Sequence, residues 1–159
     1  MSPTDPARRV VVAGMGNEYR RDDGAGPAVA GRVAARLEAV VDLGPLADPL
    51  DLLGRWDDAD LAVVVDAVRT GAPPGTVAVV DLDEVAGRPV AGAPVTSSHG
   101  IGLDRVLRLA RAVGNGPRRV LVVGVEGDDF GDGLGLTPAV ARAVDDAARR
   151  VAELIEEDR

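Results

Sequence analysis

Short apolar runs without interruption recur along this chain. The first is Val10-Val11-Val12-Ala13, which ends at Gly14, and the strongest later ones lie in Leu61–Val65 and in the segment 118–123. A strand that is apolar on both faces is typical of a parallel sheet covered by helices on both sides. These runs therefore predict an α/β protein in which they form the central strands.

Helical spacing appears between and after these runs. Within Pro27–Leu37 an apolar residue recurs at every fourth position, as on the buried stripe of a helix, and Ile101–Val113 has similar spacing. The last helix has the clearest start, with Thr137 as N-cap and Pro138 at the first helical position. One face of this helix is predicted to lie on the sheet, and it carries Val140, Val144, Ala147, Val151, Leu154 and Ile155.

Weaker signals complete the order of elements. A strand at Thr76–Val80 follows the preceding strand after a short turn, which favours an antiparallel neighbour. Strands that alternate with helices, with one antiparallel strand among them, predict a three-layer α/β/α domain. We expect one domain over residues 1–159, with residues 1–8 as a flexible N-terminus. The other predicted segments are a strand at Ala39–Asp42, a helical segment at Pro49–Trp56, an exposed loop at Asp83–Ser98 and a flexible loop at Gly127–Gly135.

Composition excludes several classes of function. The net charge of −8 opposes nucleic-acid binding, because most non-specific affinity for nucleic acids comes from attraction to phosphates. The chain has no lysine and no cysteine, which excludes Schiff-base chemistry, thiolate nucleophiles and sulfur-ligated metals. No apolar run approaches transmembrane length, and the polar start does not resemble a signal peptide. We therefore expect a cytoplasmic protein that acts away from membranes.

Polar clusters stand where predicted strands end. Asp22 and Asp23 follow the first strand, Asp66 follows the third, and His99, the one histidine, precedes a helix. In open α/β sheets, ligands gather outside the carboxyl ends of the strands. Two carboxylates and one imidazole there would suit a divalent metal such as nickel or zinc and would suffice for metal-assisted hydrolysis.

Each of these residues also has a structural interpretation. Asp22 and Asp23 precede a helix, where acidic side chains cap exposed amides, and Asp66 could satisfy a turn after its strand. The placement of His99 in a loop of small residues modestly favours a functional role.

Two other classes of function fit the sequence less well. Gly14 and Gly16 follow a strand as in dinucleotide-binding proteins, yet Tyr19 stands at the third glycine position and a long polar loop precedes the helix. A serine hydrolase would have to use Ser97 or Ser98, and the G-x-S-x-G elbow is absent.

Four blocks, in order along nearly the whole chain, resemble those of the hydrogenase maturation proteases. These endopeptidases trim the C-terminal extension from the large subunit of nickel-iron hydrogenases. The first block is similar to the family's G-x-G-N and D-[DE]-G-x-G signature, with Asp23 where many relatives have Glu. The blocks are Gly14–Asn17 with Asp22–Pro27, Val65–Val68 with Pro74–Val77, Ser97–Leu103, and Gly124–Glu126.

The resemblance implies a five-stranded mixed, mostly parallel sheet and places metal-ligand roles on Asp23, Asp66 and His99. It also implies a nickel-iron hydrogenase large-subunit precursor as the client, with nickel brought by that precursor, while zinc or another divalent metal would suit the same ligands. Asp23 and Asp66 are the candidates for a catalytic general base. The competing hypothesis is a non-catalytic metal-binding assembly module on the same fold.

Overall fold

The structure is a computed structural model that describes residues 7–85 and 100–159. His99, residues 86–98 of the predicted loop and residues 1–6 of the predicted N-terminal segment lie outside the described residues. Arg8, at the end of that predicted segment, donates a hydrogen bond to the carbonyl oxygen of Ile155 and pairs with Asp158.

The chain alternates strands and helices, as predicted. The strands are β1 (Val10–Met15), β2 (Val40–Leu46), β3 (Leu61–Val68), β4 (Val77–Asp81) and β5 (Val120–Glu126). The helices are α1 (Ala25–Arg36), α2 (Leu82–Val85), α3 (Gly100–Ala112) and α4 (Pro138–Glu157), with single 3-10 turns η1 (Arg21–Gly24) and η2 (Pro49–Leu52).

The five strands form one sheet in the order β2-β1-β3-β5-β4. All neighbours are parallel except β4, which runs antiparallel to β5. The mixed, mostly parallel sheet and the antiparallel strand are confirmed. The preceding strand, however, is not the partner of β4, because β1 and β5 already occupy both edges of β3, and β4 pairs with the outer edge of β5.

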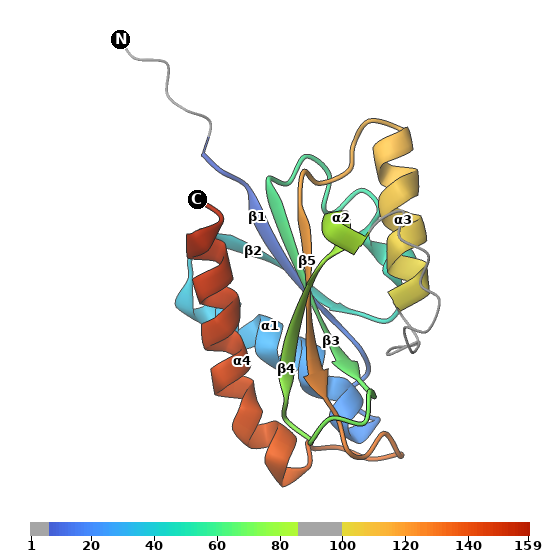
Figure 1. Ribbon diagram of the computed structural model, residues 1–159, viewed down its shortest axis with the longest axis vertical. Coiled ribbons are helices and arrows are strands. Elements are labelled where there is room, and N and C mark those ends of the chain that lie inside the picture. Colours follow the sequence, from blue (N-terminus) through green and yellow to red (C-terminus); the bar gives the residue numbers. More distant parts are fainter. Residues whose placement is uncertain (1–6, 86–99) are drawn as a thin grey trace.

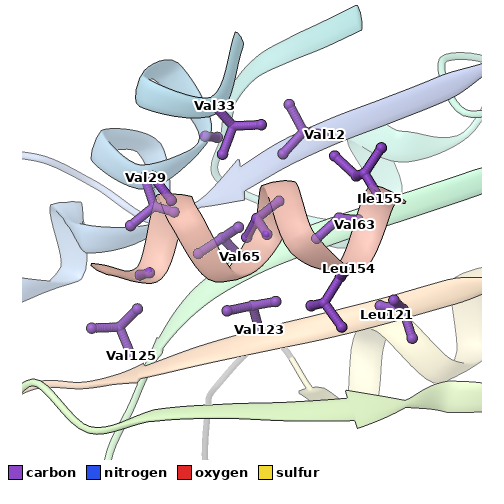
Figure 2. Packing of buried hydrophobic residues seen from close by; sticks show 14 of the residues in the cluster. Val12, Val29, Val33, Val63, Val65, Leu121, Val123, Val125, Leu154 and Ile155 are labelled. Atoms are coloured by element: carbon purple, nitrogen blue, oxygen red, sulfur yellow. The ribbon is translucent and has the colours of Figure 1, made fainter. Parts of the chain in front are cut away.

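Helices cover both faces of the sheet, which confirms the three-layer architecture. Figure 1 shows α1 and α4 on one face and α3 on the other. Because successive side chains of a strand point to opposite faces, each strand contributes to two cores. Figure 2 shows the core under α1 and α4, where Val63 and Val123 of the sheet meet Val29 of α1 and Leu154 of α4. The second core, under α3, is built around the fully buried Trp56.

The predicted buried face of α4 is confirmed, since all six of its apolar residues are buried. Three weaker predictions need correction. The strand predicted at 39–42 continues to Leu46, because it pairs with β1 as far as Met15. The predicted helix at 49–56 is one 3-10 turn, and Gly54 follows it with a φ of 81° that a helix does not adopt. The predicted exposed loop at 83–98 begins inside the helical turn α2.

Gly26 lets α1 approach the sheet closely. A Cβ at this position would lie 2.4 Å from the carbonyl oxygen of Met15 and 2.5 Å from that of Val65. We therefore expect Gly26→Ala to lower the free energy of unfolding by about 2 kcal/mol, because the helix would have to move off two strands. The measurement is urea denaturation.

Gly31 supplies the matched control in the same helix. It is exposed, and apart from the neighbouring backbone of α1 no described atom would lie within 4 Å of a Cβ at this position. Gly31→Ala should stabilise the protein by roughly 0.5 kcal/mol or more, since alanine favours the helix. Equal effects of the two substitutions would contradict the close approach of α1.

Candidate functional site

The carboxyl ends of β1 and β3 lie side by side, and Gly14 pairs with Val65 in their ladder. Asp66 follows Val65 inside β3 and pairs with Gly124, and its side chain is 4% exposed. Because β3 continues to Val68, Asp66 lies inside the strand and not after it, which corrects the position predicted from the sequence. By the alternation of the strand, its side chain points to the face that α3 covers.

Asp23 lies in η1, which packs against β3. One of its carboxylate oxygens, Oδ2, accepts a hydrogen bond of 2.8 Å from the backbone N–H of Asn17, and no described residue donates to Oδ1. Gly16 makes this packing possible: its φ is 133°, and a Cβ there would lie 1.9 Å from the carbonyl oxygen of Asp23. The turn η1 thus places Asp23 at the same edge of the sheet as Asp66.

The predicted third ligand, His99, lies outside the described residues. Helix α3 begins at Gly100, and Gly102 in its first turn packs against Pro49, which follows β2. Within residues 7–85 and 100–159, no three His, Cys, Asp or Glu side chains are grouped so that they could hold a metal ion. The structure therefore brings two of the three predicted ligands to one edge of the sheet, and the metal site stays a prediction.

Asp22 has a role that the sequence did not reveal. Its fully buried carboxylate accepts four hydrogen bonds of 2.8 to 2.9 Å, from the backbone N–H groups of Asp128, Asp129 and Thr137 and from the Thr137 hydroxyl. Burial alone would raise the pKa of Asp22, but these hydrogen bonds outweigh it and hold the pKa below its ordinary value. Asp22 is therefore ionised at neutral pH and ties η1 to the start of α4.

This tie also changes how α4 begins. Thr137 is the N-cap residue, as predicted, but its hydroxyl donates to Asp22 instead of accepting a hydrogen bond from the helix. The loop predicted to be flexible at 127–135 carries two of the donors to Asp22 and pairs with Arg20 through Gly133. The segment that carries Asp23 is thus fixed by contacts more than a hundred residues away in the chain.

Glu126 is a second buried carboxylate at this edge of the sheet, at the end of β5. Its Oε1 accepts hydrogen bonds from the backbone N–H groups of Thr70 (2.8 Å) and Gly71 (3.0 Å), and its Oε2 accepts one from the Thr70 hydroxyl (2.7 Å). Glu126 therefore fixes the chain that leaves β3 after Asp66. The sequence showed it only as the last residue of a family-like block.

We expect Glu126→Gln to cost about 1 kcal/mol of unfolding free energy. The amide oxygen of glutamine can replace Oε1, and its NH₂ group can donate to the Thr70 hydroxyl oxygen, so the backbone donors keep their acceptor. Urea denaturation gives the value. A loss of 3 kcal/mol or more would show that the negative charge itself holds the loop.

A cleft of about 310 Å³ opens beside η1 and the start of α1. Glu18, Arg21 and Pro27 line one side of it, and Leu134 and Leu136 line the other. Arg21 adopts a φ of 49° and donates to the carbonyl oxygen of Leu134, which holds the two walls together. Neither Asp23 nor Asp66 is among the described residues that line this cleft.

Comparison with known proteins decides the family. The family model of the hydrogenase maturation proteases matches residues 31–154. The chain belongs to the hydrogenase maturation protease family. Within this family, the hydrogenase expression/formation protein HupD of Thiocapsa roseopersicina is 35% identical over 158 residues, which cover 89% of this chain and 68% of HupD. The hydrogenase 2 maturation protease of Escherichia coli is 29% identical, with 94% of this chain and 92% of that protein covered.

The fold agrees with that family. The hydrogenase maturating endopeptidase HybD from E. coli superposes on this hydrogenase maturation protease with a TM-score of 0.78, at 27% identity over 94% of this chain and 93% of HybD. In the dinucleotide-binding hypothesis, β1 would lead through a tight turn into α1. Here the nine residues 16–24, with η1 and the buried Asp22, stand between strand and helix, which leaves no such turn.

Proposed function

We propose that this chain is an endopeptidase that removes the C-terminal extension from the large-subunit precursor of a nickel-iron hydrogenase after nickel has been inserted. Membership of the hydrogenase maturation protease family carries the proposal. The structure supports it with two carboxylates, Asp23 and Asp66, at the carboxyl edge of a parallel sheet, where α/β proteins bind ligands.

The two carboxylates differ in how they are held by the surrounding structure. Asp66 is buried within a strand, so its position is fixed by the sheet. Asp23 is half-buried, and one of its oxygens is engaged by the Asn17 N–H. The other oxygen can accept a proton from an attacking water, which is the task of a general base in peptide hydrolysis. We propose Asp23 and Asp66 as the catalytic pair on this ground.

The nickel in this proposal belongs to the precursor. Carboxylate oxygens and one imidazole nitrogen are suitable ligands for nickel, and zinc would accept the same set. Asp23 and Asp66 alone are fewer than three ligands, so the proposal needs His99. Two facts support its contribution: His99 directly precedes Gly100 in the sequence, and α3 begins beside Pro49 at the end of β2.

A non-catalytic assembly module is the competing function. Several relatives are called expression/formation proteins, a name that states no proteolysis, whereas the E. coli relative is called a protease. Both functions would let the chain bind a precursor. Only the proposed endopeptidase would shorten it.

The test incubates the purified protein with nickel-loaded and nickel-free precursor and follows the mass of the precursor. We expect cleavage of the nickel-loaded form only. Equal cleavage of both forms would overturn the role of the precursor's nickel, and binding without cleavage of either form would favour the assembly module.

The compartment stays a prediction. No helix in the described part of the chain is long and apolar enough to cross a membrane. We propose that cleavage takes place in the cytoplasm, as the sequence predicts, and fractionation of cells that produce the protein would test it.

A further inference from the structure

Arg69 differs from most other arginines of this acidic protein in the contacts that its side chain makes. It lies on the loop that leaves β3, three residues after Asp66, and its side chain is exposed. Its guanidinium carbon lies 4.5 Å from the centre of the Phe130 ring. Within the described residues it forms no hydrogen bond and no ion pair. The five N–H donors of its guanidinium group therefore have no acceptor in that part of the protein.

Two buried carboxylates fix the loops that carry Arg69 and Phe130. Glu126 binds the backbone of Thr70 and Gly71, directly after Arg69. Asp22 binds the backbone N–H of Asp129, directly before Phe130. The loop that carries the arginine and the loop that carries its aromatic support are thus held independently. An arginine that is held in place before its ligand arrives loses less side-chain entropy on binding.

A second cation lies beside the same aromatic residue. The Arg20 guanidinium donates a hydrogen bond of 3.4 Å to the carbonyl oxygen of Phe130. Two arginine side chains therefore contact Phe130, one at its ring and one at its carbonyl oxygen, in a chain of net charge −8. Such a pair attracts an anion, and a planar guanidinium matches a carboxylate with two parallel hydrogen bonds.

We propose that Arg69 is a specificity residue that binds a carboxylate of the client polypeptide, with Phe130 as its support. This inference rests on the proposed function, because the substrate of an endopeptidase is a polypeptide and its common anions are carboxylates. Arg69 lies three residues after Asp66, and three residues of extended chain span about 10 Å. The client polypeptide covers the same distance with about three residues, so the carboxylate bound at Arg69 lies within about three residues of the peptide bond cut at Asp66. It is either an acidic side chain near that bond or the C-terminal carboxylate of the extension.

The first test compares Arg69→Gln with the control Arg142→Gln. Arg142 is also exposed and forms no hydrogen bond or ion pair within the described residues, but it lies on α4. We expect Arg69→Gln to raise KM for the precursor about tenfold and to weaken precursor binding by a similar factor, with kcat and Tm unchanged. Arg142→Gln should leave all four quantities unchanged. Equal KM and affinity for the two variants would overturn the proposal.

The second test identifies the source of the carboxylate with two altered precursors. In one, the acidic residues within about three positions of the cleavage point become amides. In the other, ten Gly and Ser residues lengthen the extension and move its C-terminal carboxylate away. Whichever precursor lacks the bound carboxylate should show a raised KM with the wild-type enzyme and no further rise with Arg69→Gln. A full effect of Arg69→Gln on both altered precursors would overturn the proposal.

A measurement of precursor affinity tests this inference separately from the proposed function. If the wild-type protein binds a precursor without cutting it, the proposed endopeptidase function fails, yet the affinity of Arg69→Gln still tests the carboxylate site. Failure of the wild-type protein to bind either nickel-loaded or nickel-free precursor would overturn both.

Discussion

Replacement of Asp22 by alanine should destabilise the protein by about 3 kcal/mol, because it leaves four hydrogen-bond donors without their acceptor. For a chain of this size that corresponds to a fall in Tm of roughly 10 °C. Asp22→Asn should cost nearly as much. Both carboxylate oxygens accept from backbone N–H groups, so the NH₂ group of asparagine would face a donor in either orientation.

Asp128→Asn is the matched control for this prediction. Asp128 is exposed on the same loop, and only its backbone N–H donates to Asp22. Its substitution should change the free energy of unfolding by less than about 0.5 kcal/mol. Thermal and urea denaturation of the three variants measure the effect. A loss no larger for Asp22→Ala than for Asp128→Asn would contradict the role of Asp22 as the tie between η1 and α4.

Asp66→Asn and Asp23→Asn should each lower the rate of precursor processing by about 10²-fold or more, the range typical of a lost general base or of a lost ligand contact. Each substitution keeps the size of the side chain and removes its charge. Because Asn17 donates its backbone N–H to Asp23, the amide oxygen of asparagine can still accept that bond, and Asp23→Asn should stay folded. The measurement is the initial rate of cleavage of nickel-loaded precursor.

Asp132→Asn serves as the control for charge alone, since Asp132 is exposed and no described residue bonds its side chain. It should process the precursor at the wild-type rate. Wild-type rates for both Asp23→Asn and Asp66→Asn, with unchanged Tm, would reject them as the catalytic pair.

The sheet and the last helix were predictable because their signals are local. A run such as Val10–Ala13 is apolar at every position, and that pattern fits a strand buried on both faces. The buried face of α4 follows from the spacing of Val140, Val144 and Val151 along one helix. Residues close in the sequence determine each of these features.

The partners of Asp22 could not be predicted, because they are contributed by residues 128–137, more than a hundred positions later. Sequence reasoning considered capping of the adjacent helix, which is the local use of an aspartate at such a place. The predicted partner of β4 was wrong for the same reason, since the pairing of β4 depends on which edges of the sheet other strands already occupy. The support of Arg69 by Phe130 likewise joins two loops that only the fold brings together.

Release of a peptide from the C-terminus of the precursor tests the central claim most directly. Purified protein is mixed with nickel-loaded large-subunit precursor, and both products are identified by intact mass. We predict one cut that yields the shortened subunit and its C-terminal extension, and a rate of cutting lower by about 10²-fold or more with Asp66→Asn. A precursor that keeps its full mass with the wild-type protein, while the two remain bound to each other, would contradict the account.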